Sequence, residues 1–443
     1  MLPLYFLAQI FVLVCGWPLL LFWRWRRPEK FRHLHRRLSV DTALAAAAQR
    51  GNRPRIWLHA LSVGEVSSAL PLARAIRGRF PEAFFIVTVA TETGERFARQ
   101  ALADSADLIL PAPLDWLPLV RRCLRHLRPD LYIQVETDFW PGLLFSLRQR
   151  NIPALLVNGR ISAVSFRRYR RLRRLFLPMF ACFSTLAMQT EADRDKMLAL
   201  GIAAARLPVL GNLKYAADRP ALVSQTLAAL LPPGRRLWLC GSTHAGEEEI
   251  IFAVYRQLRR RFPDLFLLLA PRRPERGEEL ARLAAGHGLT ARRRSGQDQR
   301  EDGAAADLFI LDTIGELAAC YFLADVAFIG GSLVAEGGHN PLEAAWAGKP
   351  VLFGPHMEDF AEIAADLITA GAARTVTGAN DLTAALTAIL ADPAVAKKMG
   401  AAALALVQAK RRGVLDGHLE VISTLLAANP DNKTQHEGDA VQH

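Results

Sequence analysis

Three segments of the 443-residue chain place a polar capping residue three positions before a glutamate, where a helix is expected to begin. They are Ser62-Val63-Gly64-Glu65, Thr313-Ile314-Gly315-Glu316 and Asn340-Pro341-Leu342-Glu343. In a capping box the glutamate at the third helical position only reaches back to the N–H of the capping residue. A helix N-terminus also presents free N–H groups and the positive end of its dipole to an anion, so the same spacing suits a ligand site.

Glycines favour the ligand interpretation for the third segment. Gly330-Gly331-Ser332 and Gly337-Gly338 stand just before Asn340, and glycine lets the backbone approach a ligand closely. Pro341 suits a first helical position, where its missing N–H costs nothing. Glu343 would then be placed to accept hydroxyl groups of a ribose. The sequence contains neither G-x-G-x-x-G nor G-x-x-x-x-G-K-[ST], so the dinucleotide and P-loop signatures are absent.

Basic and hydroxyl side chains follow two further apolar runs in the same half of the chain. Pro271-Arg272-Arg273-Pro274-Glu275-Arg276 comes directly after Leu265 to Ala270, and arginine is suited to bidentate phosphate binding. A solvated basic loop is the alternative. Ser242-Thr243-His244-Ala245-Gly246-Glu247 follows the other run and offers hydroxyl and N–H groups to the same ligand.

The first half of the chain contributes two carboxylates and a lysine. Glu136 comes directly after the apolar run Leu131 to Val135, and Glu65 follows a separate run. Lys214, in Gly211-Asn212-Leu213-Lys214, stands near the middle of the chain. A lysine there would neutralise a leaving phosphate, whereas a plain surface lysine at a hinge is the alternative.

Metal-ligand spacings are missing from the sequence. His59, His244, His339 and His356 each stand near the end of an apolar run but form no H-E-x-x-H cluster. Asp193-Arg194-Asp195 lies in a polar stretch of helical pattern and is interpreted as solvated. The five cysteines are scattered and form no C-x-x-C pair, so neither a zinc site nor a disulfide framework is expected. We expect no metal and no cofactor.

Short apolar runs alternate with longer helical patterns from Arg55 onward, which predicts βαβ units and a parallel sheet. A connection rich in proline, from Asn212 to Arg236, separates two such series. We therefore expect two α/β domains facing across a cleft, with ligands at the carboxyl ends of the strands. The predicted strands are Ile56 to His59, Phe84 to Val89, Leu108 to Leu110, Leu131 to Val135, Ala154 to Asn158, Leu186 to Gln189, Leu237 to Cys240, Leu265 to Ala270, Leu308 to Leu311, Val326 to Ile329 and Val351 to Phe353.

The N-terminal segment is typical of a membrane anchor. Leu2 to Trp23 carries no charge, and a helix of that length covers about 30 Å, the thickness of a hydrocarbon core. Basic residues from Arg24 to Arg37 follow at once, which places the rest of the chain in the cytoplasm. A cleaved signal peptide is the alternative, but it would need its basic residues on the other side. Whether the helix spans the bilayer or lies in one leaflet stays open.

The position of the basic residues, more than the net charge, indicates which partner the chain binds. The chain carries a formal charge of +12, which suits nucleic acid, an anionic membrane or a phosphorylated substrate. Arg167, Arg168, Arg170, Arg171, Arg173 and Arg174 alternate with Phe166, Tyr169, Leu172 and Leu175 in what reads as a basic amphipathic helix. Such a helix is typical of a membrane surface, and with an anchor in the same chain nucleic acid is not expected.

Taken together, the motifs resemble those of the 3-deoxy-D-manno-octulosonic acid (Kdo) transferases of lipopolysaccharide synthesis. The resemblance covers almost the whole chain. It is carried by WLHALSVGEV from Trp57, VETDFWPG from Val135, VNGRIS from Val157, GNLK from Gly211, GSTHAGEE from Gly241, APRRPERG from Ala270, DTIGEL from Asp312 and FIGGSLVAEGGHNPLEAAWAGKPVLFGPH from Phe328.

This resemblance implies a GT-B fold and a domain plan. Residues 1–25 would be the membrane anchor with its basic flank at 24–37, residues 38–215 the acceptor-binding domain, residues 216–428 the donor-binding domain with closing helices, and residues 429–443 a disordered tail. It also implies inverting, metal-independent transfer of Kdo from CMP-Kdo to a lipid A precursor (lipid IVA-like) at the bacterial inner membrane, with the anionic membrane surface contacted through Arg24–Arg37 and Arg167–Arg174.

The resemblance assigns roles to residues as well. Its general base falls on Glu65, and its transition-state stabilising positions fall on Glu136 and Lys214. Its nucleotide-binding positions fall on Pro271, Arg272, Ile314, Gly315, Glu316, Asn340, Pro341, Leu342 and Glu343. This chain departs from the usual family pattern at Asp138-Phe139-Trp140-Pro141-Gly142, where Glu-Leu-Trp-Pro-Asn is usual, at Gly159 in place of Ala, and at Ala344 in place of Pro.

Two other functions remain to be weighed against Kdo transfer. A GT-B transferase or epimerase that uses a UDP-sugar would share the two-domain plan, and nucleotide preference would distinguish it. A non-catalytic membrane scaffold of the same fold would be expected to lose the base or the phosphate-binding residues, and this sequence retains both.

Overall fold

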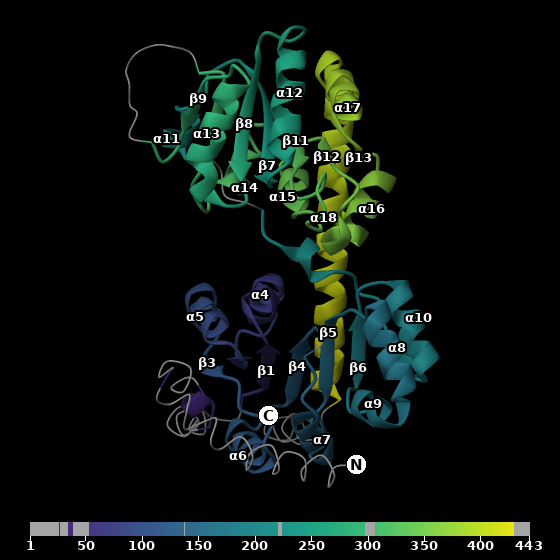
Figure 1. Ribbon diagram of the computed structural model, residues 1–443. Coiled ribbons are helices and arrows are strands. Elements are labelled where there is room, and N and C mark those ends of the chain that lie inside the picture. The colour runs from purple at the N-terminus through teal and green to yellow at the C-terminus, as the bar shows by residue number, and fades with distance from the viewer. Residues whose placement is uncertain are drawn as a thin grey trace, which may run out of the picture. The chain divides into compact units, whose positions relative to one another are not determined.

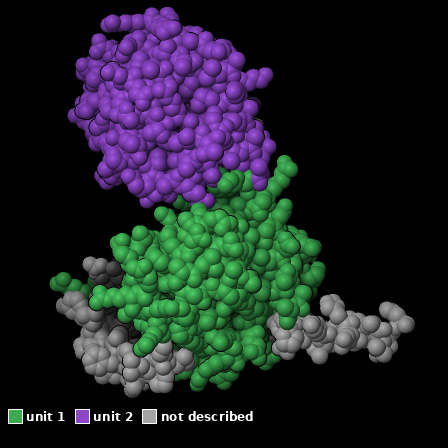
Figure 2. Space-filling model, turned by 90° about the vertical axis from the view of Figure 1, so that its right-hand side faces the viewer, with its two compact units in different colours: residues 1–217, 410–443 green, residues 218–409 purple. Residues whose placement is uncertain are grey.

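The computed structural model describes residues 26, 34–38, 53–136, 138–219, 224–296 and 306–428. The chain divides into two compact units, shown in Figure 2: unit 1 contains residues 1–217 and 410–443, and unit 2 contains residues 218–409. The predicted anchor at 1–25, most of its basic flank and the tail at 429–443 lie outside the described residues. None of the helices within those described ranges is both long enough and apolar enough to cross a membrane.

Unit 1 is built on a six-stranded parallel sheet with the order β3-β2-β1-β4-β5-β6 (Figure 1). The chain starts at the centre, builds toward one edge, and then returns to build toward the other. The strands are β1 (Arg55–Ala60), β2 (Phe84–Val89), β3 (Leu108–Pro111), β4 (Leu131–Val135), β5 (Ala154–Gly159) and β6 (Thr185–Met188). The helices are α4 (Val63–Arg79), α5 (Glu92–Ala101), α6 (Leu117–Leu127), α7 (Pro141–Gln149), α8 (Ala163–Arg171), α9 (Arg173–Phe180) and α10 (Glu191–Leu200), with the 3₁₀ turns η1 (Ala204–Arg206) and η2 (Leu213–Ala216).

Unit 2 has a seven-stranded sheet with the order β13-β12-β11-β7-β8-β10-β9. Its strands are β7 (Arg236–Thr243), β8 (Leu265–Pro271), β9 (Ala291–Arg293), β10 (Leu308–Ile310), β11 (Val326–Ile329), β12 (Val351–Phe353) and β13 (Ala373–Thr375). Its helices are α11 (Gln225–Ala228), α12 (Glu247–Arg259), α13 (Gly277–Gly286), α14 (Leu317–Cys320), α15 (Leu342–Trp346), α16 (Ala361–Thr369) and α17 (Ala379–Ala391), with the 3₁₀ turns η3 (Pro274–Arg276) and η4 (Glu358–Phe360).

Buried apolar strands explain both sheets. Every residue of β1, β2 and β4 is buried, as expected for parallel strands covered by helices on both faces. Each strand predicted from the sequence is present with small differences at its ends, and every pairing between strands is parallel, as predicted. The prediction missed β9 and β13, which are three-residue strands. Their sequences, ARR and ART, contain no apolar run, and they form by pairing with β10 and β12 at the two edges of the sheet.

The long C-terminal helix α18 (Pro393–Ala427) belongs to both units. The sequence assigned residues 216–428 to the second domain, whereas the contacts place residues from Lys410 onward in unit 1. Arg411 Nε donates to the carbonyl of Ala216 at 3.3 Å. A Cβ added to Gly417 would lie 3.1 Å from the Leu210 side chain, so a glycine here lets the helix pack closely on unit 1.

Each sheet has one point where the direction of strand addition reverses, and ligands bind outside the strand ends at such points. In unit 1 this point lies between β1 and β4, and in unit 2 between β7 and β11. The loops that follow these four strands contain half of the residues predicted from the sequence to do chemistry, namely Glu65, Glu136 and the segment from Asn340 to Glu343.

Candidate functional site

Glu65 lies at the start of α4, directly after β1, and is 8% exposed. Its Oε2 accepts a hydrogen bond from the backbone N–H of Leu61. Burial raises the pKa of Glu65 to about 8; the Leu61 hydrogen bond is the next largest effect and opposes it, and the negative charges of Glu136 and Asp138 add smaller upward shifts. A carboxyl group with a pKa near the working pH is suited to accept a proton from a substrate.

Glu136 follows β4, on the other side of the reversal point. Its φ of 57° places it in the left-handed region, which is uncommon for a residue with a side chain. Asn158, at the end of the neighbouring strand β5, has a φ of 58° and donates from Nδ2 to Glu136 Oε1 at 3.1 Å. Backbone conformations of this kind are retained where the surroundings enforce them, and they cluster at functional sites.

The same asparagine positions the turn that contains Lys214. Asn158 Oδ1 accepts from the N–H of Leu213 at 2.9 Å, at the start of η2. Asn212 Oδ1 accepts from the N–H of Lys214 at 3.0 Å. The helix α4, which carries Glu65, packs directly against η2, which carries Lys214. Asn158 connects η2 to Glu136, so the three side chains belong to one cluster within unit 1. All three catalytic residues predicted from the sequence therefore lie in one region.

A second layer of polar residues stands behind this cluster. Trp140 Nε1 donates to Asp138 Oδ2 at 2.7 Å, and the carbonyl of Asp138 accepts from Gln134 Nε2. His59 is buried in β1, with Nδ1 3.0 Å from Thr88 Oγ1 and Nε2 3.8 Å from Asp138 Oδ2. These contacts fix the loop between β4 and α7 on which Glu136 depends.

In unit 2 the loops at the reversal point are joined by Glu247, the first residue of α12, which is fully buried. Its carboxylate accepts from the N–H groups of His244 at 2.9 Å and Gly331 at 2.7 Å. It also accepts from Ser332 at 3.0 Å and Leu333 at 2.9 Å. The N–H groups of Gly331 and Ser332 are therefore engaged by Glu247, so a ligand that approaches these residues closely would not find them as donors.

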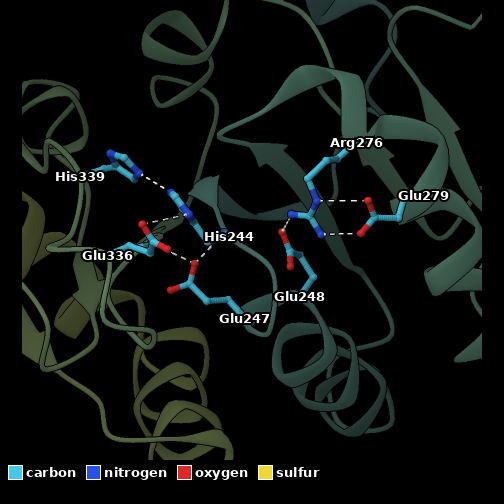
Figure 3. A network of polar contacts seen from close by, with 8 residues as sticks. His244, Glu247, Glu248, Arg276, Glu279, Glu336 and His339 are labelled. Carbon is cyan, nitrogen blue, oxygen red and sulfur yellow. Dashed lines mark hydrogen bonds and ion pairs between the residues drawn. The ribbon is translucent and has the colours of Figure 1, made fainter.

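Two histidines meet above this junction (Figure 3). His244, after β7, and His339, after β11, place their Nε2 atoms 2.8 Å apart, with the rings stacked at an interplanar angle of 21°. Burial lowers the pKa of His339 to about 4, with additional lowering by His244 and Arg272 and smaller opposing effects of Asp359 and Glu336. Arg272 therefore acts close to this pair.

The predicted arginine loop after β8 separates into two roles. Arg276 is bound inside the protein, since its Nη1 lies 2.7 Å from Glu248 Oε1 and its Nη2 lies 2.8 Å from Glu279 Oε1 (Figure 3). Arg272 is exposed, and within the described parts of the chain no carboxylate lies within ion-pair distance of its guanidinium. Its backbone N–H donates to Thr243 at 3.0 Å. Arg272 is thus available to bind an anion, whereas Arg276 connects η3 to α12 and α13 through its ion pairs with Glu248 and Glu279.

The segment after β10 places Glu316 differently from the predicted helix start. Glu316 precedes the four-residue helix α14 instead of occupying its third position. Its carboxylate bonds Thr313 Oγ1 and receives two guanidinium nitrogens of Arg294, which lowers its pKa. Ile314 is 88% exposed and Gly315 has a φ of 90°, so their backbone forms an open turn beside this ion pair.

The segment after β11 forms only a five-residue helix that starts one residue later than predicted, with Pro341 at the N-cap instead of the first helical position. Asn340 Oδ1 accepts from the N–H of Leu342 at 3.1 Å, and α15 begins at Leu342. Burial raises the pKa of Glu343. Across the described ranges the Glu343 carboxyl has no hydrogen-bond or ion-pair partner. A half-buried carboxyl group of this kind is suited to accept hydrogen bonds from the hydroxyl groups of a ligand.

The first of the three helix starts also departs from a capping box. Ser62 caps α4 with its backbone only, and its side chain makes no capping bond. Glu65 accepts from the N–H of Leu61, one residue before the expected partner, Ser62.

No group of three metal-ligating side chains occurs among the residues that the structure describes.

The sequence analysis missed the supporting roles of Asn158 and Asn212, the bonds of Glu247 to the loop after β11, and the pairing of His244 with His339. Asn158 had a detectable signal, because it is a polar residue within the otherwise apolar strand ALLVNG. Glu247 and the two histidines had none, because their contacts join segments 84 to 95 residues apart along the chain.

The chain is similar in sequence to known transferases and in fold to solved two-domain structures. A family model described as 3-Deoxy-D-manno-octulosonic-acid transferase (kdotransferase) matches residues 29–217. A 3-deoxy-D-manno-octulosonic acid transferase of Haemophilus influenzae is 33% identical over 378 residues, 84% of this chain and 88% of that protein. A crystal structure of a glycosyltransferase from Rickettsia africae superposes with a TM-score of 0.58 at 14% identity, covering 85% of this chain and all of the other. UDP-GlcNAc 2-epimerase from Neisseria meningitidis gives 0.58 at 12% identity, covering 84% of this chain and all of the other.

The two parallel-sheet units resemble in fold those of GT-B glycosyltransferases. The chain is a glycosyltransferase. It belongs to the 3-deoxy-D-manno-octulosonic acid (Kdo) transferase family.

Burial of Glu65 has a consequence for stability. Its pKa of about 8 in the folded protein exceeds the value near 4.3 of an unfolded glutamate, so the folded state holds the extra proton between these values. The free energy of unfolding therefore falls as pH rises through this window. We expect Glu65→Gln to be as stable as the parent at pH 5 and more stable at pH 8, by about 1–3 kcal/mol. Thermal melts between pH 5 and 8 measure this. The exposed Glu92→Gln is the control, and an equal effect of Glu65→Gln at both pH values would contradict the shift.

Proposed function

We propose that this family member transfers Kdo from CMP-Kdo to a lipid A precursor in lipopolysaccharide biosynthesis, with Glu65 as the general base. Unit 1 would supply the base and the acceptor site, and unit 2 would hold the nucleotide. Inversion and independence from a metal rest on the family resemblance. The observation that supports the proposal most is the Glu65 carboxyl, buried at the reversal point of unit 1 with its pKa raised to about 8.

Proton removal from the acceptor hydroxyl is the step that Glu65 would perform. Its hydrogen bond from Leu61 holds Oε2 and leaves Oε1 for the substrate. A positioned base of matched pKa contributes about 10²–10⁴-fold to a rate. Glu136 and Lys214 would act beside it, the lysine by offsetting negative charge on the departing CMP. Asn158 would keep both of these elements in place through its bonds to Glu136 and Leu213.

Nucleotide binding would use the loops after β7, β8, β10 and β11, which are neighbours in the sheet of unit 2. Arg272 is exposed and suits the phosphate, while the open turn at Ile314 and Gly315 offers backbone groups. The unpartnered Glu343 carboxyl suits the ribose hydroxyls. Pro271, Glu316, Asn340, Pro341 and Leu342 would shape these loops.

The direct test is incubation with CMP-Kdo and tetraacylated lipid A precursor, followed by mass spectrometry of the product. We expect a mass increase of one or more Kdo residues. Glu65→Gln should lower kcat by about 10²–10⁴-fold because the base is lost, and CMP affinity should stay nearly constant because the nucleotide loops are intact. UDP should bind more weakly than CMP in calorimetry. Normal turnover by Glu65→Gln would exclude it as the base, and a preference for UDP would favour the UDP-sugar alternative.

Attachment to the cytoplasmic face of the bacterial inner membrane is the second part of the proposal. It rests on the uncharged stretch Leu2 to Trp23 and the basic residues that follow it. Deleting residues 2–23 should release the protein from membranes that keep the full chain through a carbonate wash at high pH. Extraction of the full chain by carbonate would contradict an anchor that spans the bilayer.

A basic surface on α8 and α9 would bring the lipid acceptor to unit 1. Arg167, Arg168, Arg170, Arg171, Arg173 and Arg174 are all exposed. The single helix predicted from the sequence is wrong, because the helix is interrupted at Leu172. Tyr169 packs inward against Phe176 and Phe180, whereas Leu172 and Leu175 remain 45% and 52% exposed. Exposed leucines among arginines suit a lipid surface with anionic headgroups.

Replacing two of these arginines should weaken the use of the lipid acceptor alone. We expect Arg167→Ser with Arg171→Ser to raise the KM for the acceptor about tenfold or more in anionic mixed micelles, since each basic residue near an anionic surface contributes about 1 kcal/mol. The KM for CMP-Kdo should not change. Arg121→Ser with Arg125→Ser, an exposed pair at the same spacing on α6, is the matched control. Equal effects of the two double variants would rule out a specific surface.

A further inference from the structure

The histidine pair stands at the place where the sheet of unit 2 binds ligands. His244 follows β7 and His339 follows β11, the two strands that flank the reversal point. Their Nε2 atoms are 2.8 Å apart. Arg272 follows β8 at the same edge of the sheet, and it is near enough to lower the pKa of His339. The negative charge of an anion bound to Arg272 would therefore be felt by the histidine pair as well.

The backbone around the pair is built to hold both rings in place. Glu247 holds the N–H group of His244 (Figure 3). The same carboxylate oxygen also accepts from the N–H group of Gly331. Gly331 has a φ of 68°, and a Cβ there would lie 3.1 Å from the His339 ring and 3.5 Å from the His244 ring. A side chain at Gly331 would therefore crowd the His339 ring. Both are half-buried, so the pair is accessible to a ligand and is not a filler of the core.

The contact between the rings limits their protonation. Two imidazole nitrogens at 2.8 Å share one proton, because two N–H groups facing each other would repel. Burial lowers the pKa of His339 to about 4, so this ring is neutral at pH 7 in the free protein. The charged groups that face the pair are Arg272, Asp359 and Glu336, and Glu336 Oε2 lies 3.9 Å from His244 Nδ1. The Glu247 carboxylate is engaged by backbone N–H groups.

We propose that the His244–His339 pair binds the anionic group of the nucleotide donor and takes up one proton from solvent as it does so. This inference rests on the proposed CMP-dependent function. The anion would separate the two Nε2 atoms and accept a hydrogen bond from each ring. Each neutral ring carries one N–H, so a ring that accepts through Nε2 holds its own proton on Nδ1. In His244 that nitrogen faces Glu336 Oε2 at 3.9 Å, and while its proton stays there Nε2 can donate to the anion only after taking one proton from solvent, with no other bond changed. The negative charge of the bound anion favours this protonated ring.

A structural role would give a different result. If the pair only joined two loops, the nucleotide would leave its protonation unchanged, and replacing either ring would destabilise the loops equally at every pH. Proton uptake instead makes CMP binding tighter at low pH. A rise of one pKa unit corresponds to a tenfold change in affinity over the titrating range.

The test is an NMR titration of the full-length protein labelled at histidine Cε1, with and without saturating CMP. Resonances are assigned with His244→Asn and His339→Asn. We expect the midpoint of at least one ring of the pair to rise by one pH unit or more when CMP binds. His287, at the end of α13 in the same unit, serves as an internal control and should not respond. The phosphate of CMP itself titrates near pH 6, roughly, and is followed separately by its ³¹P resonance.

Affinity measurements complete the test. Between pH 8 and pH 6.5 CMP binding by the parent should tighten about two- to fourfold more than binding by His339→Asn or His339→Gln, as expected for a midpoint that rises to between 6.5 and 7. Unchanged midpoints in a protein that binds CMP would overturn the inference and leave the proposed function standing. Failure of the parent to bind CMP at any pH would overturn both. The labelled parent protein gives the decisive midpoint even where a variant fails to fold.

Discussion

Burying a carboxylate costs free energy unless hydrogen bonds replace the lost water, and two glutamates of this chain meet that constraint in opposite ways. Glu247 in unit 2 receives four backbone N–H groups from two loops. Glu65 in unit 1 has one hydrogen bond, from Leu61, and two negative neighbours. Glu247, whose oxygens have hydrogen-bond donors, joins loops. Glu65, which has a single donor and a raised pKa, is able to take up a proton. The same residue type is thus structural in one sheet and reactive in the other.

Parallel sheets explain why these groups come together at all. All strands of a sheet end on one edge, so residues that follow different strands meet there, and the gap at the reversal point is where a ligand fits. In unit 1 this rule joins Glu65 with Glu136, and in unit 2 it joins His244 with His339. The strained φ values of Glu136, Asn158 and Ser242 occur at the same edges. Such strain costs of the order of 1–3 kcal/mol per residue and is kept where the neighbours enforce it.

Sequence reasoning succeeded where the signal was local. Apolar runs such as FFIVTV and LFLLLAP predicted strands, and polar residues directly after them marked the candidate site. It failed where the outcome depended on partners distant in the chain. Nothing in Thr313 to Glu316 shows that Arg294 takes the carboxylate, and nothing in Gly330 to Ser332 shows that Glu247 fills their N–H groups. The interruption at Leu172 was missed because the arginines continue through it without a proline or glycine to mark the end of α8.

The departures from the usual family pattern near Glu136 follow from close packing behind the site. Gly142 stands where asparagine is usual, and a Cβ there would lie 2.6 Å from Asp115 Oδ1. Asp115 accepts from the N–H groups of Gly142 and Leu143, so the glycine lets this carboxylate cap α7 directly. Gly159 stands where alanine is usual, and its Cβ would lie 2.9 Å from the carbonyl oxygen of Ala187 on β6. At both positions the space beside the loops after β4 and β5 is too small for a side chain unless its neighbours move. Both glycines lie next to, and not among, the groups proposed to do the chemistry.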